Sequence, residues 1–346
     1  MGLFGGRGKG QQQGNGRQAA AVAQFWSWWI DEGMARSSTA LADGDPGRIV
    51  ADLTAHVEAV AADLTWEFAK GDTSMHRLVV TADGDPHLRA AARRWFEAAP
   101  EGDVFWSYAD ARPPMLDLGG AQIELDGVTL ALDQVRVGVR RSGTRVDVQV
   151  HHPSLEQLSP GARNTFCFLA VDAAVGELLT ETWIGELEPA VAAPIDSFGL
   201  TGLRAVVRDL ADEFSGENQW VALEGVGAGG PVHVLARVPL AAASAPKFNQ
   251  CVMVVLTGLK GENGLPDDEA RSRVDTFRDH LVDRLEGQGE LVAVLFAAGE
   301  CLLYFYVDGE RTGAEQLRAA VRGWPGKARV EVEDDPGWAN VAHLRG

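Results

Sequence analysis

The stretch CVMVVL, residues Cys251–Leu256, is an uninterrupted apolar run of strand length. Such a run is typical of a strand buried on both faces inside a sheet, because a strand with one wet face would alternate with polar residues. Two further apolar runs, Leu291–Ala297 and Cys301–Val307, are separated by the tripeptide AGE, a length typical of a hairpin connection. The three runs predict neighbouring strands of one sheet.

Two one-faced helices are expected to alternate with these strands. The first begins at Pro266, followed by three acidic residues that suit the positive end of a helix dipole, and its apolar positions fall at helical spacing between residues 274 and 285. The second is expected at 314–324, and a last strand at 328–332 alternates with charges. The order β-α-β-β-α-β is the split βαβ motif. The sequence therefore predicts an α+β protein whose C-terminal domain, residues 246–346, is a ferredoxin-like sandwich.

One face of the predicted sheet has no helix of this domain to cover it. Tyr304 and Tyr306 point to that face together with Leu302, because alternate residues of a strand share a side. Trp338 follows the last strand and is a further aromatic candidate for the same surface. We expect these residues to bind a protein partner. Two alternatives stay open: a homodimer through this open sheet face, or coverage of the face by the first domain of the same chain.

Three segments of the C-terminal domain resemble a known bacterial family. They are Gly264–Glu269 (GLPDDE), Phe277–Asp279 (FRD) and Tyr304–Tyr306 (YFY), and together they resemble the domain of unknown function 695. That family is distantly similar to the regulator B of ribonuclease E activity. The resemblance implies a ferredoxin-like fold and a regulatory, protein-binding role, and it brings no catalytic residue. The family-like motif consists of Gly264, Leu265, Pro266, Glu269 and Asp279.

The rest of the chain is predicted to form a second, more acidic domain. The Gly- and Gln-rich residues 1–18 have little to bury and predict a disordered tail. The segment QFWSWW that follows has aromatic residues at helical spacing, which favours a helix anchored on a core. The small, Pro-flanked stretch 239–246 (PLAAASAP) reads as a linker, so the sequence predicts an acidic α+β domain at 19–240.

The charge balance excludes some classes of partner. The chain has 31 Lys and Arg against 49 Asp and Glu, a net charge of −18, which argues against direct binding to nucleic acid or to an anionic membrane surface. Its three cysteines lie far apart inside apolar runs, as expected of buried thiols in a reducing compartment. No apolar run is long enough to cross a membrane, and a cytoplasmic location is expected.

The sequence contains no motif for a catalytic, cofactor or metal site. It has no G-x-S-x-G elbow, no phosphate-binding loop and no cluster of His and Cys at metal-ligand spacing. His151 and His152 precede a proline at the expected end of a strand, and Glu177 lies in an acidic run, so these three are the remaining candidates for a cleft. We predict neither a catalytic residue nor a cofactor.

These observations favour a non-enzymatic protein-binding or regulatory module, with a ribonuclease among the candidate partners. Two alternatives stay open. The first is a hydrolase-type enzyme that uses carboxylates and a histidine at the interdomain cleft. The second is an immunity or antitoxin protein whose acidity complements a basic partner.

Overall fold

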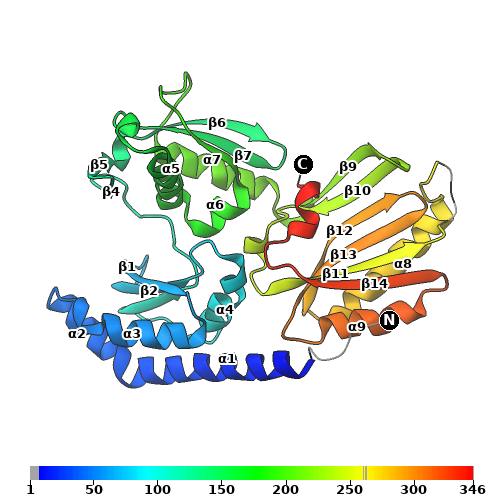
Figure 1. The fold of residues 1–346 in the computed structure, drawn as a ribbon, viewed down its shortest axis with the longest axis horizontal. Coiled ribbons are helices and arrows are strands. Elements are labelled where there is room, and N and C mark those ends of the chain that lie inside the picture. The colour runs from blue at the N-terminus through cyan, green and yellow to red at the C-terminus, as the bar shows by residue number, and fades with distance from the viewer. Residues whose placement is uncertain (1–7, 260, 262, 346) are drawn as a thin grey trace. The chain divides into compact units, whose positions relative to one another are not determined.

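The protein has the mixed α+β architecture that the sequence predicts (Figure 1). The computed structural model describes residues 8–259, 261 and 263–345. The chain divides into two compact units, Met1–Arg112 and Pro113–Gly346, which are described separately.

The first unit packs helices on a small sheet. The sheet has the order β1-β2-β3, in which β1 and β2 are antiparallel and β2 and β3 are parallel. The elements are α1 (Gly8–Trp28), the π-helical turn η1 (Trp29–Gly33), α2 (Met34–Ala42), α3 (Gly47–Val60), β1 (Thr65–Ala69), β2 (His76–Thr81), α4 (Pro86–Glu97) and β3 (Trp106–Ala109).

The aromatic segment QFWSWW anchors α1 on this unit's core, as predicted. Phe25, Trp26 and Trp29 are buried, and Trp26 stacks on Trp95 at 4.7 Å between ring centroids. The helix continues towards the N-terminus as far as Gly8, so residues 8–18 are helical where the sequence predicts a disordered tail. The glycines at positions 8, 10, 14 and 16 have poor helix propensity, so the helix here depends on the packed C-terminal half of α1, which provides the nucleus from which it extends. Residues 1–7 of the predicted tail lie outside the described residues.

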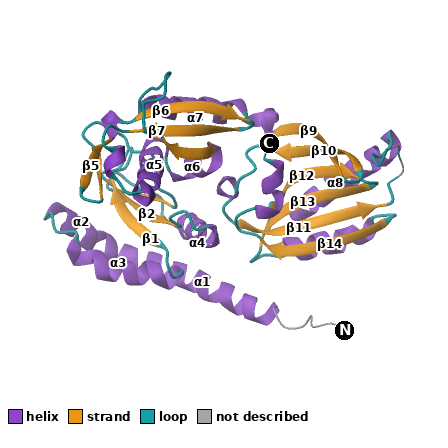
Figure 2. Ribbon diagram, turned by 45° about the horizontal axis from the view of Figure 1, so that its top comes forward, coloured by secondary structure: helices purple, strands orange, loops and turns teal. Residues whose placement is uncertain are grey.

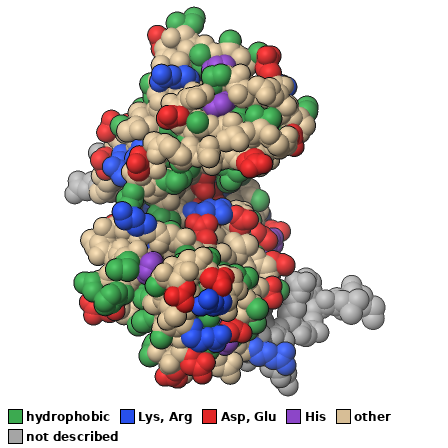
Figure 3. Space-filling model, turned by 90° about the vertical axis from the view of Figure 1, so that its left-hand side faces the viewer, with side chains coloured by type: hydrophobic (Ala, Val, Ile, Leu, Met, Phe, Trp, Pro, Cys, Tyr) green, Lys and Arg blue, Asp and Glu red, His purple; other side chains and the backbone are tan. Residues whose placement is uncertain are grey.

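Acidic and basic side chains are interspersed on the face of the molecule shown in Figure 3. In the first unit several of them are paired, for example Arg48 with Asp43 at 2.6 Å. An exposed pair of this kind contributes little to stability, but mixed charges keep a surface soluble. The acidity is therefore not concentrated in one patch on this face.

The second unit begins with a helix-covered sheet of order β6-β7-β8 and a separate β4-β5 hairpin. The helices α5 and α7 pack on the sheet through a core that includes Val148, Phe166 and Val207. The elements are β4 (Gln122–Leu125), β5 (Val128–Ala131), β6 (Arg136–Ser142), β7 (Arg145–His151), α5 (Pro160–Val175), α6 (Glu177–Trp183), β8 (Ile184–Pro189) and α7 (Leu200–Glu213).

The second unit ends in an antiparallel sheet of six strands, in the order β14-β11-β13-β12-β10-β9 (Figure 2). Helices α8 and α9 lie on one face of it, and the succession β11-α8-β12-β13-α9-β14 follows the predicted βαββαβ order. The elements are β9 (Trp220–Gly227), β10 (Gly230–Arg237), β11 (Phe248–Thr257), α8 (Asp268–Leu285), β12 (Gly289–Ala297), β13 (Glu300–Asp308), α9 (Gly313–Ala320) and β14 (Lys327–Asp334). Short 3-10 turns are η2 (Leu132–Gln134), η3 (Leu155–Gln157), η4 (Gly216–Gln219), η5 (Ala242–Ser244), η6 (Val321–Gly323) and η7 (Ala339–Leu344).

The pairing of β9 and β10 with the C-terminal sheet does not agree with the predicted domain boundary at 240–246. β10 pairs with β12 from Val232↔Ala297 to Ala236↔Ala293, so the sheet of the C-terminal part includes residues that the sequence assigns to the N-terminal domain. The predicted linker is also packed, because Leu240, Ala241 and Ala243 are buried. The compact units instead divide after Arg112.

Candidate functional site

The aromatic residues predicted to bind a partner are buried in a core that the C-terminal segment of the same chain helps to form. Tyr306 is 0% exposed, Trp338 is 1% exposed, and Tyr304 is also buried. They belong to a core on the sheet face opposite α8 and α9, which the predicted linker and the turn η7 cover. Tyr306 and Trp338 are therefore not part of the accessible surface, which corrects the expectation of an open aromatic face.

The C-terminal segment 335–345 is held to the sheet by specific contacts, and we refer to it as the C-terminal strap. The Tyr306 hydroxyl donates to Oδ2 of Asp335 at 2.5 Å, and its ring stacks on that of Trp338 at 4.3 Å. The Nε1–H of Trp338 donates to the Phe248 carbonyl at 2.8 Å, and Nε of Arg345 donates to the Leu240 carbonyl at 2.9 Å. Burial raises the pKa of Tyr306 above its ordinary value. These hydrogen bonds and the ring stacking hold the strap to the sheet.

Part of the same face remains accessible beyond the strap. Leu302, the fourth predicted partner residue, is half-buried there, and Met253, Leu295 and Val232 share that state. Leu302 is thus the one member of the predicted set that keeps appreciable exposure.

The cleft candidates do not form an accessible acid–base site. His152 is buried: its Nδ1 accepts from the backbone N–H of Ser154 at 3.0 Å, and its ring lies edge-on to Phe166. Burial lowers the pKa of His152. Glu177 is buried in the first turn of α6, while His151 is half-buried with Nδ1 3.0 Å from the Ala190 carbonyl. With His152 and Glu177 closed to solvent, neither can meet a substrate in this conformation.

The family-like motif builds the start of α8. Gly264 adopts a positive φ of 81°, and its carbonyl accepts from the Gly299 N–H at 2.8 Å. Pro266 is buried and Leu265 packs against the core beneath α8, while Glu269 pairs with Arg273 on the exposed helix surface. These residues position the helix. The last motif residue, Asp279, lies further along α8 and lines a groove.

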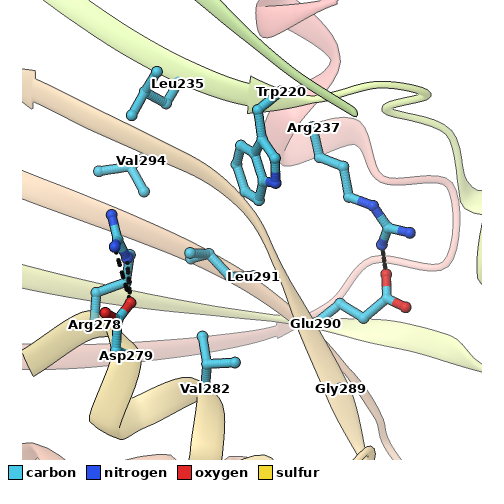
Figure 4. Close-up of a pocket in the computed structure, with 10 residues that line it drawn as sticks. All are labelled: Trp220, Leu235, Arg237, Arg278, Asp279, Val282, Gly289, Glu290, Leu291 and Val294. Carbon is cyan, nitrogen blue, oxygen red and sulfur yellow. Dashed lines mark hydrogen bonds and ion pairs between the residues drawn. The ribbon is translucent and has the colours of Figure 1, made fainter. Parts of the chain in front are cut away.

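The groove lies on the helix-covered side of the sheet, where β9 and β10 extend past α8 (Figure 4). It encloses about 560 Å³. Three large apolar side chains meet in it and remain exposed: Trp220 from β9 (43%), Leu235 from β10 (37%) and Val282 from α8 (41%). Its other lining residues are Arg237, Arg278, Asp279, Gly289, Glu290, Leu291 and Val294.

Charged pairs stand at the rim of this apolar floor. Arg237 pairs with Glu290 on one side, and Arg278 contacts Asp279 at 2.8 Å on the other (Figure 4). Arg278 also contacts Asp275 at 2.8 Å. Burial lowers the pKa of Arg237 from its ordinary value, although the guanidinium stays charged at any physiological pH. An apolar floor with a polar rim is the anatomy of a protein interface.

Sequence patterns did not reveal this groove. Asp279 belongs to the family-like motif, but no sequence pattern identifies Trp220, Leu235 and Val282, because their convergence depends on β9 and β10 joining the sheet. The one sequence feature that indicates the groove is the apolar Val282, which interrupts the otherwise polar outer face of α8 and is exposed in the structure.

Comparison with known proteins adds one finding about this part of the chain. Residues 234–342 match the family described as "Family of unknown function (DUF695)". This confirms the predicted resemblance. The chain matches no curated protein and no solved structure.

The DUF695 region begins inside β10 and ends inside η7. It therefore includes the second half of β10 and most of the C-terminal strap, but not β9. Of the three exposed apolar residues in the groove, Leu235 and Val282 lie within the DUF695 region, whereas Trp220 precedes it.

The thiols of the chain are poorly suited to chemistry. Cys251 and Cys301, both in the DUF695 region, are buried, and burial raises the pKa of each to about 12. Burial likewise raises the pKa of Cys167 to about 11. A nucleophilic cysteine needs a lowered pKa and access to solvent. Among the described residues, no group of three or more His, Cys, Asp or Glu side chains could hold a metal ion.

Within the described part of the chain, none of the helices combines the length and the apolar character needed to cross a bilayer.

Proposed function

We propose that this protein is a non-enzymatic, cytoplasmic protein-binding module, and that the groove beside α8 receives its partner. The observation that carries the proposal is the convergence of Trp220, Leu235 and Val282, three exposed apolar side chains from separate elements, on one groove. Isolated exposed apolar residues are ordinary, but a cluster rimmed by charges marks an interaction site. Tryptophan and arginine are also the residues that most often dominate binding energy.

The shape of the groove favours an amphipathic helix as the bound element. A helix wall on one side and a strand floor on the other leave a channel for apolar residues at helical spacing, while the rim pairs can accept polar neighbours. The net charge of −18 favours partners with a basic surface, because complementary potentials raise the rate of encounter. A ribonuclease would satisfy that condition, and so would a basic toxin.

The topology is compatible with this regulatory interpretation. We interpret the order β14-β11-β13-β12, with α8 and α9 on one face, as the predicted ferredoxin-like sandwich extended by β10 and β9. The sequence resemblance implies a distant similarity of this family to a ribonuclease regulator, and a partner-binding role would agree with it. The hydrolase alternative loses support, because two of its acid–base candidates, His152 and Glu177, are buried.

A pair of variants tests the groove. Val282→Lys places a charge on the helix wall of the apolar groove, and Val191→Lys makes the same change at a position that is 63% exposed in the loop after β8. Full-length wild type and both variants are purified from the cells of origin, and co-purifying proteins are quantified by mass spectrometry. Losing one interface anchor costs about 2 kcal/mol, roughly a thirtyfold weaker complex.

The proposal predicts a partner that wild type and Val191→Lys retain and Val282→Lys loses. Equal recovery of every partner by the two lysine variants, or no partner with wild type, would contradict it.

A further inference from the structure

The two edges of the six-stranded sheet are protected very differently. The edge strand β14 has charged side chains at Lys327, Arg329, Glu331 and Glu333, which discourage pairing with another strand. The opposite edge strand, β9, has the sequence WVALEGVG and contains a single charge, Glu224. Among the described strands, β9 pairs with β10 on one side, and on the other side it ends the sheet.

Strand β9 is also the more exposed of these two strands. Val226 is 89% exposed and Trp220 is 43% exposed, and both lie on the helix-covered side of the sheet, because their β10 partners are Pro231 and Arg237. Leu223 lies on the opposite side, where it packs at the margin of the strap-covered core. An exposed apolar edge is a template for adding a further strand.

We propose that β9 pairs with β9 of a second copy of this chain, antiparallel across a two-fold axis at Leu223. In this register Leu223 lies opposite Leu223 of the second copy, and Trp220 lies opposite Val226 of the second copy. Trp220 of each copy then covers Val226 of the other, and the symmetric interface contains this contact two times. Glu224 faces Ala222, so no like charges stand directly opposite.

Neighbouring registers are worse. An axis at Glu224 sets two carboxylates against each other, which is destabilising. An axis at Ala222 sets Trp220 against Glu224 and leaves Val226 without an apolar partner. The sequence of the strand thus matches itself best at Leu223, and this self-complementarity favours a second copy over an unrelated extended peptide.

The dimer has two consequences for the molecule. Because the axis is perpendicular to the sheet, both copies keep α8 on the same side, and Val226 of one copy borders the groove of the other. Each copy carries a net charge of −18, so repulsion opposes association and added salt should strengthen it. A complex with a basic partner would show the opposite dependence on salt.

Cysteine cross-linking in the full chain tests the register. Leu223→Cys places a thiol on the axis, where directly opposed residues have Cβ atoms about 4.5–5.5 Å apart, close enough for a disulfide. Val226→Cys is the matched control, because its thiol is more exposed but lies about six residues along the strand from its own counterpart. The native cysteines are buried and give little background.

We expect Leu223→Cys to form a covalent dimer at least tenfold faster than Val226→Cys under mild oxidation. Sedimentation of the wild type should show a concentration-dependent dimer that increases with salt. Equal rates for the two variants, faster cross-linking of Val226→Cys, or a monomer at every concentration and salt level would overturn the proposal. The groove variant Val282→Lys should leave cross-linking unchanged, so the two proposals can fail independently.

Discussion

The hydroxyl of Tyr306 donates a 2.5 Å hydrogen bond to Asp335, and this contact joins the centre of the sheet to the C-terminal strap. Asp335 also accepts from the backbone N–H groups of Ala339 and Asn340, at 2.8 and 2.9 Å, so one carboxylate organises the turn that covers the sheet. Hydrogen bonds to an ionised group are the stronger kind. The strap is therefore fastened at Asp335 as well as packed at Trp338.

Removing the Tyr306 hydroxyl should loosen the strap. We expect Tyr306→Phe to lower the free energy of unfolding by about 1.5–3 kcal/mol, because a buried hydrogen bond to a charged group is lost. Hydrogen exchange of residues 335–345, measured by mass spectrometry, should accelerate. Tyr304→Phe is the control, since within the described residues the Tyr304 hydroxyl makes no hydrogen bond. An equal effect of the two substitutions would show that the bond to Asp335 does not fasten the strap.

Gly289 occupies a position that has no room for a side chain. A Cβ added there would lie 2.6 Å from Cγ1 of Val307 and 2.7 Å from the Tyr306 carbonyl, both on the neighbouring strand β13. We expect Gly289→Ala to destabilise the second unit by about 1–3 kcal/mol, measured by urea denaturation. Gly323→Ala, at a site with no heavy atom within 4 Å of the added Cβ, should change stability little. A neutral Gly289→Ala would mean that β12 and β13 are less closely paired than described.

The sequence predicted the βαββαβ succession well because its pattern is continuous there. The run Cys251–Leu256 lies inside β11, and the stripe from Val274 to Leu285 is the buried face of α8. Each of these elements buries a regular set of positions, so periodicity alone identifies it. The family-like motif was likewise readable from local sequence, because Pro266 and the acidic residues after it predict the start of the helix α8.

The sheet extension and the strap were not predictable in the same way. Small residues such as Ala241 and Ala243 look like a flexible linker by composition, yet they fit closely against a sheet face. The turn η7 is too short to show a period, so the sequence assigns Trp338 to the surface of Tyr306 but does not show that the two rings stack and close that surface. The groove depended on the same extension, because Trp220 and Val282 are distant in the chain. Local pattern predicts elements, but it does not predict which surfaces they cover.

All three tyrosines of the chain should resist ionisation while the protein is folded. Burial raises the pKa of Tyr108, Tyr304 and Tyr306 above the ordinary value of about 10. A raised folded-state pKa gives stability that is fully present below pH 10 and is lost as pH rises through the folded value. We expect tyrosinate absorbance to appear at higher pH in the folded protein than in urea. Titration of one tyrosine near pH 10 with the fold intact would contradict this.

The position of the structural boundary can be tested with fragments. A fragment starting at residue 246, the predicted boundary, would lose β9 and β10 and the segment 239–245 that covers part of the sheet. It would expose Val292 and Ala293, which are fully buried, and leave the β12 edge unpaired. Each large apolar side chain returned to water costs about 1.5–3 kcal/mol, and an open apolar edge promotes aggregation.

Fragment 113–346 should therefore fold cooperatively, while fragment 246–346 should aggregate or unfold at a much lower urea concentration. A fragment from Gly216 onward, which restores β9 and β10, should recover most of the lost stability and solubility. Circular dichroism and sedimentation of the three fragments give the comparison. If 246–346 were as stable as 216–346, the strand pairing between β10 and β12 would contribute little. The C-terminal part would then be a four-stranded domain with two appended strands, because its core could close without β9 and β10.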